Sequence, residues 1–327
     1  AIPGKYPLFS GSRISKNANG KLVDVTRLVA PFLTEIGVVN DASWSDYNQD
    51  GKTDLFLAGD WMPVTILKNK GRKFENVTTK TSLAMATGFW KTICPVDIDN
   101  DGDLDYVVGN IGLNTRLQSN QEEPIRTYVA DFDGNGTMDP LLTYYIQGKE
   151  SLIHTRDVVL DQMISLKKKY LSYKEFSKAS IEDVVGSEAH ANSIVFTASE
   201  LRSAIIINLG GDQFLMKWLP LEAQLFPVRS VITKDINADG RTDVILAGNG
   251  QDAHFSYGKD LAGQGLVLLS EADGDFAVVK SNISGLTLGG VITAMELIKQ
   301  SNDNMILICL DQIEKSHVYR VKTDATK

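Results

Sequence analysis

The stretch Asp97-Ile98-Asp99-Asn100-Asp101-Gly102-Asp103-Leu104-Asp105 sets five carboxylates around one glycine, and the apolar run Tyr106-Val107-Val108 follows it at once. Acidic side chains at positions 1, 3 and 5 of a tight loop supply the oxygen ligands that Ca²⁺ prefers. A glycine at position 6 lets the backbone turn sharply where other residues would be strained. The stretch therefore predicts a calcium loop that leads directly into a β-strand.

Three further segments repeat this nine-residue pattern: 46–54 (DYNQDGKTD), 131–139 (DFDGNGTMD) and 235–243 (DINADGRTD). Each has an oxygen-bearing side chain at positions 1, 3, 5 and 9, and position 7 can offer its backbone carbonyl. The sequence thus predicts up to four calcium ions. The predicted ligands are Asp46, Asn48, Asp50, Lys52, Asp54, Asp97, Asp99, Asp101, Asp103, Asp105, Asp131, Asp133, Asn135, Thr137, Asp139, Asp235, Asn237, Asp239, Arg241 and Asp243.

Two other interpretations of these loops are less consistent with the sequence. An EF-hand shares the first six positions, but it needs a Glu at position 12 and a helix after it. Position 12 here is Leu57, Val108, Leu142 or Leu246, within strand-like runs. The ninth-position Asp must therefore close the site, in a loop between two strands. Plain Asp/Gly-rich turns remain possible for one loop, but four copies of one pattern disfavour them.

Composition and charge agree with a globular protein whose acidity is balanced by calcium. Of the 327 residues, 43% are apolar and 23% are charged, as in a globular protein. Fourteen of the 41 acidic residues lie in the four loops, and four Ca²⁺ ions would cancel the net charge of −8. That charge argues against nucleic-acid binding, and no apolar run is long enough to span a membrane. Weak multiple calcium loops suit extracellular calcium levels, so we expect an extracellular or cell-surface location.

The two cysteines, Cys94 and Cys309, each lie in an apolar strand-like run. We interpret both as buried free thiols. A disulfide between them is the alternative that the sequence leaves open.

The spacing of recurring segments predicts a β-propeller. A strand, a Gly turn and a Phe recur at 66–74, 205–214 and 266–276, and the loops begin at 46, 97, 131 and 235. Short strands with hairpin turns and a period near 50 residues are typical of four-stranded blades. We expect residues 1–327 to form one all-β propeller domain of about six to seven blades, the first of them incomplete. Segment 154–186 changes to helical spacing and is predicted to be a mostly helical insertion.

The loops and several flanking segments resemble the FG-GAP/VCBS repeat family, whose best-known members are the integrin α-subunit propellers. The wider chain is similar to bacterial VCBS-repeat proteins related to those with the UnbV/ASPIC domain. The resemblance rests on the four loops and on segments 3–7, 59–63, 109–114, 219–224 and 248–249. It implies a calcium-stabilised propeller, usually of seven blades, on a secreted or cell-surface protein. Because the chain starts in mid-blade and no UnbV/ASPIC domain follows, we expect a fragment of a larger parent protein.

Equivalent loops of a propeller emerge on one face, and the residues after three predicted strands suit a glycan or protein ligand. Aromatic rings offer stacking faces, while Asn and Arg supply directional hydrogen bonds. The candidate ligand-binding residues are Trp61, Trp90, Asn110, Asn114, Arg116, Asn249, His254 and Tyr257. The alternative is that the tryptophans pack between blades and the asparagines cap turns.

Catalysis finds little support in the sequence. None of the four histidines lies in a nucleophile or zinc motif, and no G-x-S-x-G segment is present. We therefore predict a non-enzymatic, extracellular binding or adhesion module for glycan or protein ligands. A carbohydrate-active enzyme on a propeller scaffold and a purely structural spacer of a larger surface protein remain the alternatives.

Overall fold

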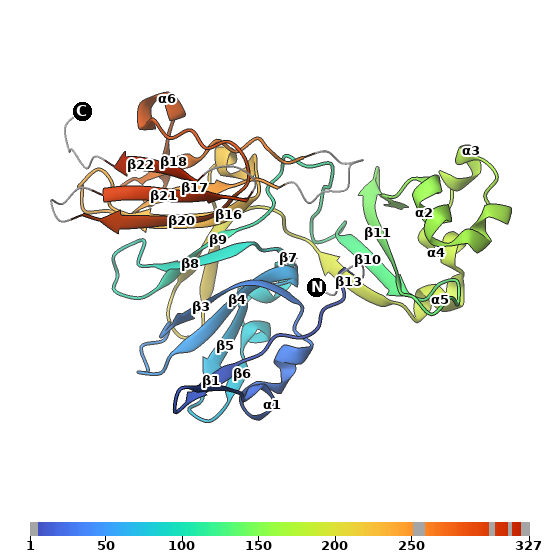
Figure 1. Ribbon diagram of the computed structural model, residues 1–327, viewed down its shortest axis with the longest axis horizontal. Helices are drawn as coiled ribbons and strands as arrows, with labels where there is room; N and C mark the ends of the chain where they lie inside the picture. The colour runs from blue at the N-terminus through green and yellow to red at the C-terminus, as the bar shows by residue number, and fades with distance from the viewer. Residues whose placement is uncertain (1–5, 251–258, 301–304, 313–315, 322–327) are drawn as a thin grey trace.

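The computed structural model describes residues 6–250, 259–300, 305–312 and 316–321, and its regular structure consists mainly of antiparallel β-sheets (Figure 1). We call the described residues of 6–109 and 204–321 the body and residues 110–203 the insertion. The body contains four sheets of three or more strands, in chain order. The first sheet is β3 (Val38–Ser45), β4 (Asp54–Met62), β5 (Thr65–Asn69) and β6 (Phe74–Asn76), with β7 (Gly88–Phe89) paired to β4.

The other body sheets have the same up-and-down order. The second sheet consists of β8 (Thr92–Val96), β9 (Asp105–Gly109), β14 (Ala204–Asn208) and β15 (Phe214–Trp218). The third sheet consists of β16 (Val228–Lys234), β17 (Asp243–Gly248), β18 (Leu266–Ser270) and β19 (Phe276–Val279). The fourth sheet consists of β20 (Ile292–Lys299), β21 (Met305–Asp311) and β22 (His317–Val321). The three predicted hairpins are confirmed as β5–β6, β14–β15 and β18–β19.

The strand after each body loop is buried along its whole length because both of its faces are covered. In β9, Tyr106 and Val108 pack toward the first sheet, where the Tyr106 ring stacks on Phe56 at 3.9 Å. Val107, between them, packs toward the third sheet. Since alternate side chains of a strand point to opposite faces, a strand that is buried along its whole length needs a packing partner on each side. The successive apolar runs therefore stack the sheets face to face.

The first strands of the four body sheets lie side by side. β3 contacts β8, β8 contacts β16, and β16 contacts β20, and Figure 1 shows them following one another across the body. This is the order in which propeller blades are arranged. Four sheets of this series are present among the described residues, and they do not show the closed ring of six to seven blades that the sequence predicts.

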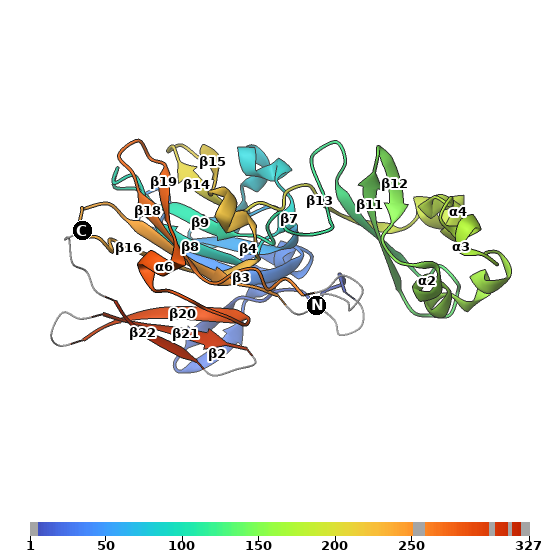
Figure 2. The ribbon, with the colours of Figure 1, turned by 90° about the horizontal axis from the view of Figure 1, so that it is seen from above.

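The insertion interrupts the second sheet between its second and third strands. β9 pairs with β14, for example Val108 with Ala204, although the insertion separates them in the chain. The insertion has its own sheet, in the order β12-β11-β10-β13, and it projects from the body (Figure 2). Its strands are β10 (Ile125–Ala130), β11 (Asp139–Ile146), β12 (Lys149–Leu152) and β13 (Ile194–Ala198). The loop at 131–139 joins β10 to β11, so it belongs to this sheet and not to the body series.

Helices cover one side of the insertion sheet. They are α2 (Arg156–Gln162), η4 (Ile164–Lys168), α3 (Tyr173–Phe176), α4 (Ile181–Val185) and α5 (Ser187–Ala191), so the helical part extends past the predicted 154–186. Ser172 and Ser180 each begin a helix with a reciprocal capping box. Val159, Met163 and Phe176 pack from the helices against Tyr128 and Leu141 of the sheet. The insertion therefore has a core of its own.

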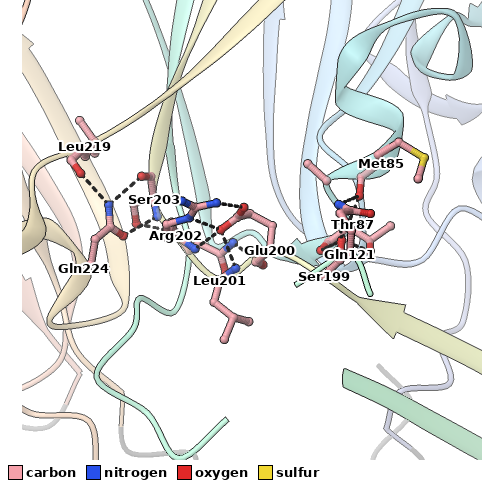
Figure 3. A network of polar contacts seen from close by, with 12 residues as sticks. Met85, Thr87, Gln121, Ser199, Glu200, Leu201, Arg202, Ser203, Leu219 and Gln224 are labelled. Carbon is pink, nitrogen blue, oxygen red and sulfur yellow. Dashed lines mark hydrogen bonds and ion pairs between the residues drawn. The ribbon is translucent and has the colours of Figure 1, made fainter. Parts of the chain in front are cut away.

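A polar network fixes the point where the insertion rejoins the body (Figure 3). Ser199 donates its hydroxyl to the Met85 carbonyl at 2.9 Å, and Glu200 forms an ion pair with Arg202 at 2.8 Å. The Gln224 side chain accepts from the Ser203 N–H and donates back to the Ser203 carbonyl, at 2.7 and 2.9 Å. These bonds hold the chain on both sides of the junction.

Short elements complete the body. They are β1 (Ser15–Ala18), β2 (Lys21–Asp24), α1 (Thr26–Val29), η1 (Pro31–Thr34), η2 (Thr78–Lys80), η3 (Ser82–Met85), η5 (Leu221–Gln224) and α6 (Ser281–Ser284). Ala30 and Leu33 pack on the face of the first sheet that turns away from the second. Cys94 and Cys309 are both free thiols. Within the described residues, no helix is long and apolar enough to cross a membrane.

Candidate metal centres

All four loops close through the same contact. The first-position Asp accepts a hydrogen bond from the N–H of the sixth-position Gly: Asp97 accepts from Gly102 at 3.1 Å, and Asp131 accepts from Gly136 at 2.8 Å. The pairs Asp46–Gly51 and Asp235–Gly240 repeat it at 2.8 and 2.9 Å. The third-position side chain accepts from the N–H of the fifth residue in every loop. The side chains at positions 1 and 3 therefore fold back onto the backbone of their own loop.

The backbone turn needs a second left-handed residue that the sequence analysis did not identify. The sixth-position Gly102 has φ +93°, and the fourth-position Asn100 has φ +59°. Position 4 of the other loops is also left-handed, and its residue there is Gln49, Gly134 or Ala238. Because these residues differ in type, the position had no sequence signal beyond the glycine of the third loop.

The ninth-position Asp is buried in every loop, with an exposed fraction of 0% for Asp54, Asp105 and Asp243 and 2% for Asp139. Asp105 accepts from the Ile98 N–H of its own loop at 3.1 Å and from the Asn208 N–H at the end of β14 at 2.8 Å. Asp54 accepts from the Asn69 N–H at the end of β5, and Asp243 accepts from the Ser270 N–H at the end of β18. In the body, this carboxylate therefore ties each loop to the third strand of its sheet.

Burial makes these carboxylates hard to ionise without a cation. Desolvation raises the pKa of Asp105 to about 6, and the neighbouring charges of Asp99 and Asp103 act in the same direction. Desolvation also raises the pKa of Asp54, Asp139 and Asp243. The pKa of Asp103 is raised as well, first by desolvation and then by the charges of Asp101, Asp99 and Asp97. The loops therefore concentrate negative charge where water does not compensate it.

The donor atoms fit a hard cation. Carboxylate oxygens of Asp97, Asp99 and Asp105 all lie within 4.8 Å of one another, and those of Asp131, Asp133 and Asp139 do the same. Asp54 Oδ2, Asp97 Oδ1 and Asp103 Oδ1 are buried and have no hydrogen-bond partner among the described residues. Buried acceptors without a partner are costly, and a Ca²⁺ ion with all-oxygen ligands would satisfy them.

Two loops differ from the others at position 7, where the sequence analysis counted only the backbone carbonyl. Lys52 Nζ lies 3.0 Å from Asp50 Oδ2, and Arg241 contacts the Asp239 carboxylate. The equivalent residues of the other loops, Asp103 and Thr137, carry no positive charge. Loops 46–54 and 235–243 thus partly neutralise their own fifth-position carboxylate.

Four of the eight candidate ligand-binding residues are buried, which corrects their predicted place on an open ligand face. Trp90 is 0% exposed, and its indole N–H donates to the Ala86 carbonyl at 3.2 Å. Trp61 is 8% exposed, has φ +63°, and packs on Phe89 at the junction with the insertion. Asn110 and Asn249 donate their amides to backbone carbonyls. These four residues therefore agree with the alternative interpretation, in which the tryptophans pack in the interior and the asparagines cap turns.

The remaining candidates are divided between a groove and residues outside the described ranges. Asn114 and Arg116 line a cavity of about 700 Å³ between the insertion and the body, together with Leu142, Ile153 and Lys259. His254 and Tyr257 lie outside the described residues. The predicted eight-residue ligand face is therefore not assembled as one surface among the described residues.

The loop geometry agrees with the comparison to known families. The model of the FG-GAP-like repeat family matches residues 46–108, which include the first two loops and strands β4 to β9. This segment is therefore similar to an FG-GAP-like repeat. No curated protein matches it. Among solved structures, the biofilm matrix protein Bap1 of V. cholerae is similar over 94% of this chain and 66% of that one, with 9% identity and a TM-score of 0.30.

Proposed function

We propose that the protein is a calcium-stabilised, extracellular β-propeller module that binds glycan or protein ligands without catalysing a reaction. The observation that carries the proposal is the recurrence of one loop geometry at four places, in which the first-position Asp accepts from the sixth-position N–H and the ninth-position Asp is buried. In two of these loops three carboxylate oxygens lie within 4.8 Å of one another. The FG-GAP-like match at residues 46–108 supports it, because the resemblance to integrin-type repeats implies an exported binding protein. We further propose that the four body sheets are blades of a propeller within a larger parent protein.

Each loop would hold one Ca²⁺ through its first, third, fifth and ninth side chains and its seventh carbonyl. The ion would neutralise carboxylates that otherwise repel one another. The protein's own contribution is positioning: the sixth-position N–H orients the first Asp, and the ninth Asp links the loop to its sheet. Calcium would thereby stabilise the sheets on which a ligand surface is built.

The proposal is tested by binding to an array of glycans and matrix proteins, once with Ca²⁺ and once with EDTA. We expect ligands that are retained with Ca²⁺ and lost with EDTA. The variant Asp97→Asn should weaken that calcium dependence, whereas Asp161→Asn, at a side chain 80% exposed and outside the loops, should not. A blank array from folded, calcium-loaded protein, or turnover of any polysaccharide on it, would contradict the proposal.

A further inference from the structure

Loop 46–54 is less completely closed by its own residues than the other three loops. In those loops the second-position N–H donates to the ninth-position Asp. Ile98 donates to Asp105 at 3.1 Å, and the equivalent bonds of the other two loops measure 3.1 and 2.9 Å. Among the described residues, no such bond joins Tyr47 to Asp54, and Asp54 Oδ2 is buried without a hydrogen-bond partner. The shape of this loop therefore depends more on contacts from outside it.

The second sheet supplies such contacts through Asn208, the last residue of β14. The Asn208 side chain is 2% exposed and donates to the Tyr47 carbonyl at 2.8 Å. Its backbone N–H donates to Asp105 Oδ1, also at 2.8 Å. Tyr47 lies between Asp46 and Asn48, the first two predicted ligands of its loop. One buried residue is therefore bonded to the ninth ligand of one loop and to the backbone between two ligands of the other.

Two further hydrogen bonds join the same pair of loops. Gln49 Nε2 donates to the Gly102 carbonyl at 3.0 Å, from the left-handed fourth position of one loop to the glycine of the other. Ser45 directly precedes the first loop and Tyr106 directly follows the second, and their hydroxyls share a buried hydrogen bond of 2.5 Å. The two loops are thus linked at both of their ends and in the middle.

The residues equivalent to Asn208 in the first and third sheets bond to their own loops instead. Asn69 ends β5 and Ser270 ends β18, and the N–H of each donates to the ninth Asp of its loop, as in Asn208. The Asn69 amide donates to the Thr53 carbonyl at 2.9 Å, and the Ser270 hydroxyl donates to the Thr242 carbonyl. Of these three equivalent side chains, that of Asn208 alone reaches the neighbouring loop.

The loops of the second and third sheets provide a comparison. Val96 and Val244 take the places that Ser45 and Tyr106 have between the first and second sheets, and both pack in an apolar cluster. Neither valine side chain can donate or accept a hydrogen bond. Because apolar packing is less directional than hydrogen bonding, we expect weaker coupling between these two loops.

We propose that loops 46–54 and 97–105 bind calcium as a coupled pair and that Asn208 is the positioning residue that couples them. The inference rests on the proposed calcium binding, and it adds that these two sites do not fill independently. An ion in either loop raises the affinity of the other loop, because coupling between two binding sites is reciprocal.

The coupling follows from the order in which the side chains are fixed. Asp105, when held as a ligand, fixes the Asn208 N–H, and the Asn208 amide then fixes the Tyr47 carbonyl. The Asp46 and Asn48 side chains on either side of Tyr47 are thereby already placed. A site whose ligands are already placed loses less conformational freedom on binding, so it binds more tightly.

The test is a calcium titration followed by NMR at the Gly51 and Gly102 amides, which report their two loops separately. Each of these N–H groups donates to the first Asp of its own loop, so it responds locally. We expect Asp97→Asn to raise the calcium concentration at the Gly51 midpoint at least about fivefold. Asp235→Asn, the same change in the loop of the third sheet, is the matched control and should shift that midpoint by less than about twofold.

Asn208→Ser separates the link from the ligands. It gives the second sheet the residue type of Ser270, keeps the N–H to Asp105 and removes the amide that reaches Tyr47. In this background Asp97→Asn should shift the Gly51 midpoint by less than about twofold. Asn69→Ser, whose lost amide bonds within its own loop, is the matched control and should keep the full shift.

Gln49→Ala tests the second link at an exposed residue, where a folding defect is not expected. Alanine is the residue of loop 235–243 at this position, and Ala238 has the same left-handed backbone, with φ +59° against +54° for Gln49. The variant should reduce the shift caused by Asp97→Asn only in part, because the buried bond of Asn208 remains.

The possible outcomes separate this inference from the proposed function. Equal shifts of the Gly51 midpoint by Asp97→Asn and Asp235→Asn, or no shift from either, would overturn the inference and leave calcium binding standing. A full shift retained in both Asn208→Ser and Gln49→Ala would overturn it as well. Amides that do not respond to calcium in the wild type would refute the proposed calcium binding, and the inference with it.

Reciprocity gives a last check on the pair. Asp46→Asn, which weakens the first loop, should raise the calcium concentration at the Gly102 midpoint. An effect in one direction only would contradict coupling between the two sites.

Discussion

The loop at 97–105 in the body and the loop at 131–139 in the insertion have the same pattern but support different structures. Asp105 bonds to the Asn208 N–H, on a strand that follows the whole insertion. Asp139 instead accepts from the Gln162 side chain of α2 at 3.1 Å and from the Phe132 N–H of its own loop. One loop therefore holds a sheet together, and the other holds a sheet to a helix. The comparison teaches that the same motif stabilises different units according to the partner of its ninth residue.

Calcium removal should have the largest effect, and it should separate the two regions. Each proposed site would add about 1.8 kcal/mol to the free energy of unfolding when calcium is about twentyfold above its Kd. Three sites lie in the body and one lies in the insertion, so EDTA should destabilise the body by about 5 kcal/mol and the insertion by about 2 kcal/mol. Hydrogen exchange of the β9 and α2 amides, with and without calcium, measures the destabilisation of the body and of the insertion. An equal loss of stability in the two regions would contradict the assignment of three sites to the body and one to the insertion.

Removing the ninth carboxylate should have the next largest effect. Asp105→Ala leaves the Ile98 and Asn208 N–H groups without their acceptor and should cost about 3 kcal/mol of unfolding free energy. Asp139→Ala should cost about 1–2 kcal/mol, confined to the insertion, because one of its two bonds is to a side chain. Part of each loss should persist in EDTA. Chemical denaturation, followed by hydrogen exchange of the body and of the insertion separately, checks both variants. A loss of stability in the body from Asp139→Ala would contradict the proposed difference between the two loops.

The pH dependence of stability should change sign with calcium. Because the pKa of Asp105 is raised to about 6, the calcium-free protein binds its proton more tightly folded than unfolded. Its stability should therefore fall as the pH rises from about 4 through about 6, by up to about 3 kcal/mol. With saturating calcium the ligands must be ionised, so stability should rise over the same range. Thermal melts from pH 4 to 7 in both conditions measure this, and parallel profiles would refute it.

The smallest effect concerns the internal cations of the body loops. Lys52→Met removes the ammonium group beside Asp50 and should tighten calcium binding at loop 46–54 by only roughly threefold, since both side chains of the pair remain partly exposed to solvent. Lys73→Met, on a nearby exposed hairpin residue outside the loop, is the matched control. Calcium titration of both variants checks the prediction. Weaker binding in Lys52→Met would show that the lysine supports the loop and does not compete with the ion.

Patterns of adjacent residues predicted the loops and hairpins, but they could not predict contacts between segments that lie far apart in the chain. The nine-residue loops and the Gly–Phe hairpins are encoded in adjacent residues, so their positions follow from the sequence. The place of the insertion does not, because the pairing of Val108 with Ala204 leaves no local signal in either segment. Loop 131–139 was therefore counted with the blades. Trp61 and Asn110 are residue types that are common in ligand sites, and only the packing at the junction shows that they are buried.

Asp97→Asn tests the calcium claim most directly. The amide oxygen can still accept the Gly102 N–H, so the loop keeps its fold, while the variant loses a charge beside four other carboxylates. We predict that its melting temperature in EDTA is equal to or higher than that of wild type, because repulsion is relieved. In calcium it should lose about 5 °C of the calcium-dependent gain. Equal melting temperatures of variant and wild type in calcium, or equal losses in calcium and in EDTA, would show that the loop does not hold a metal ion.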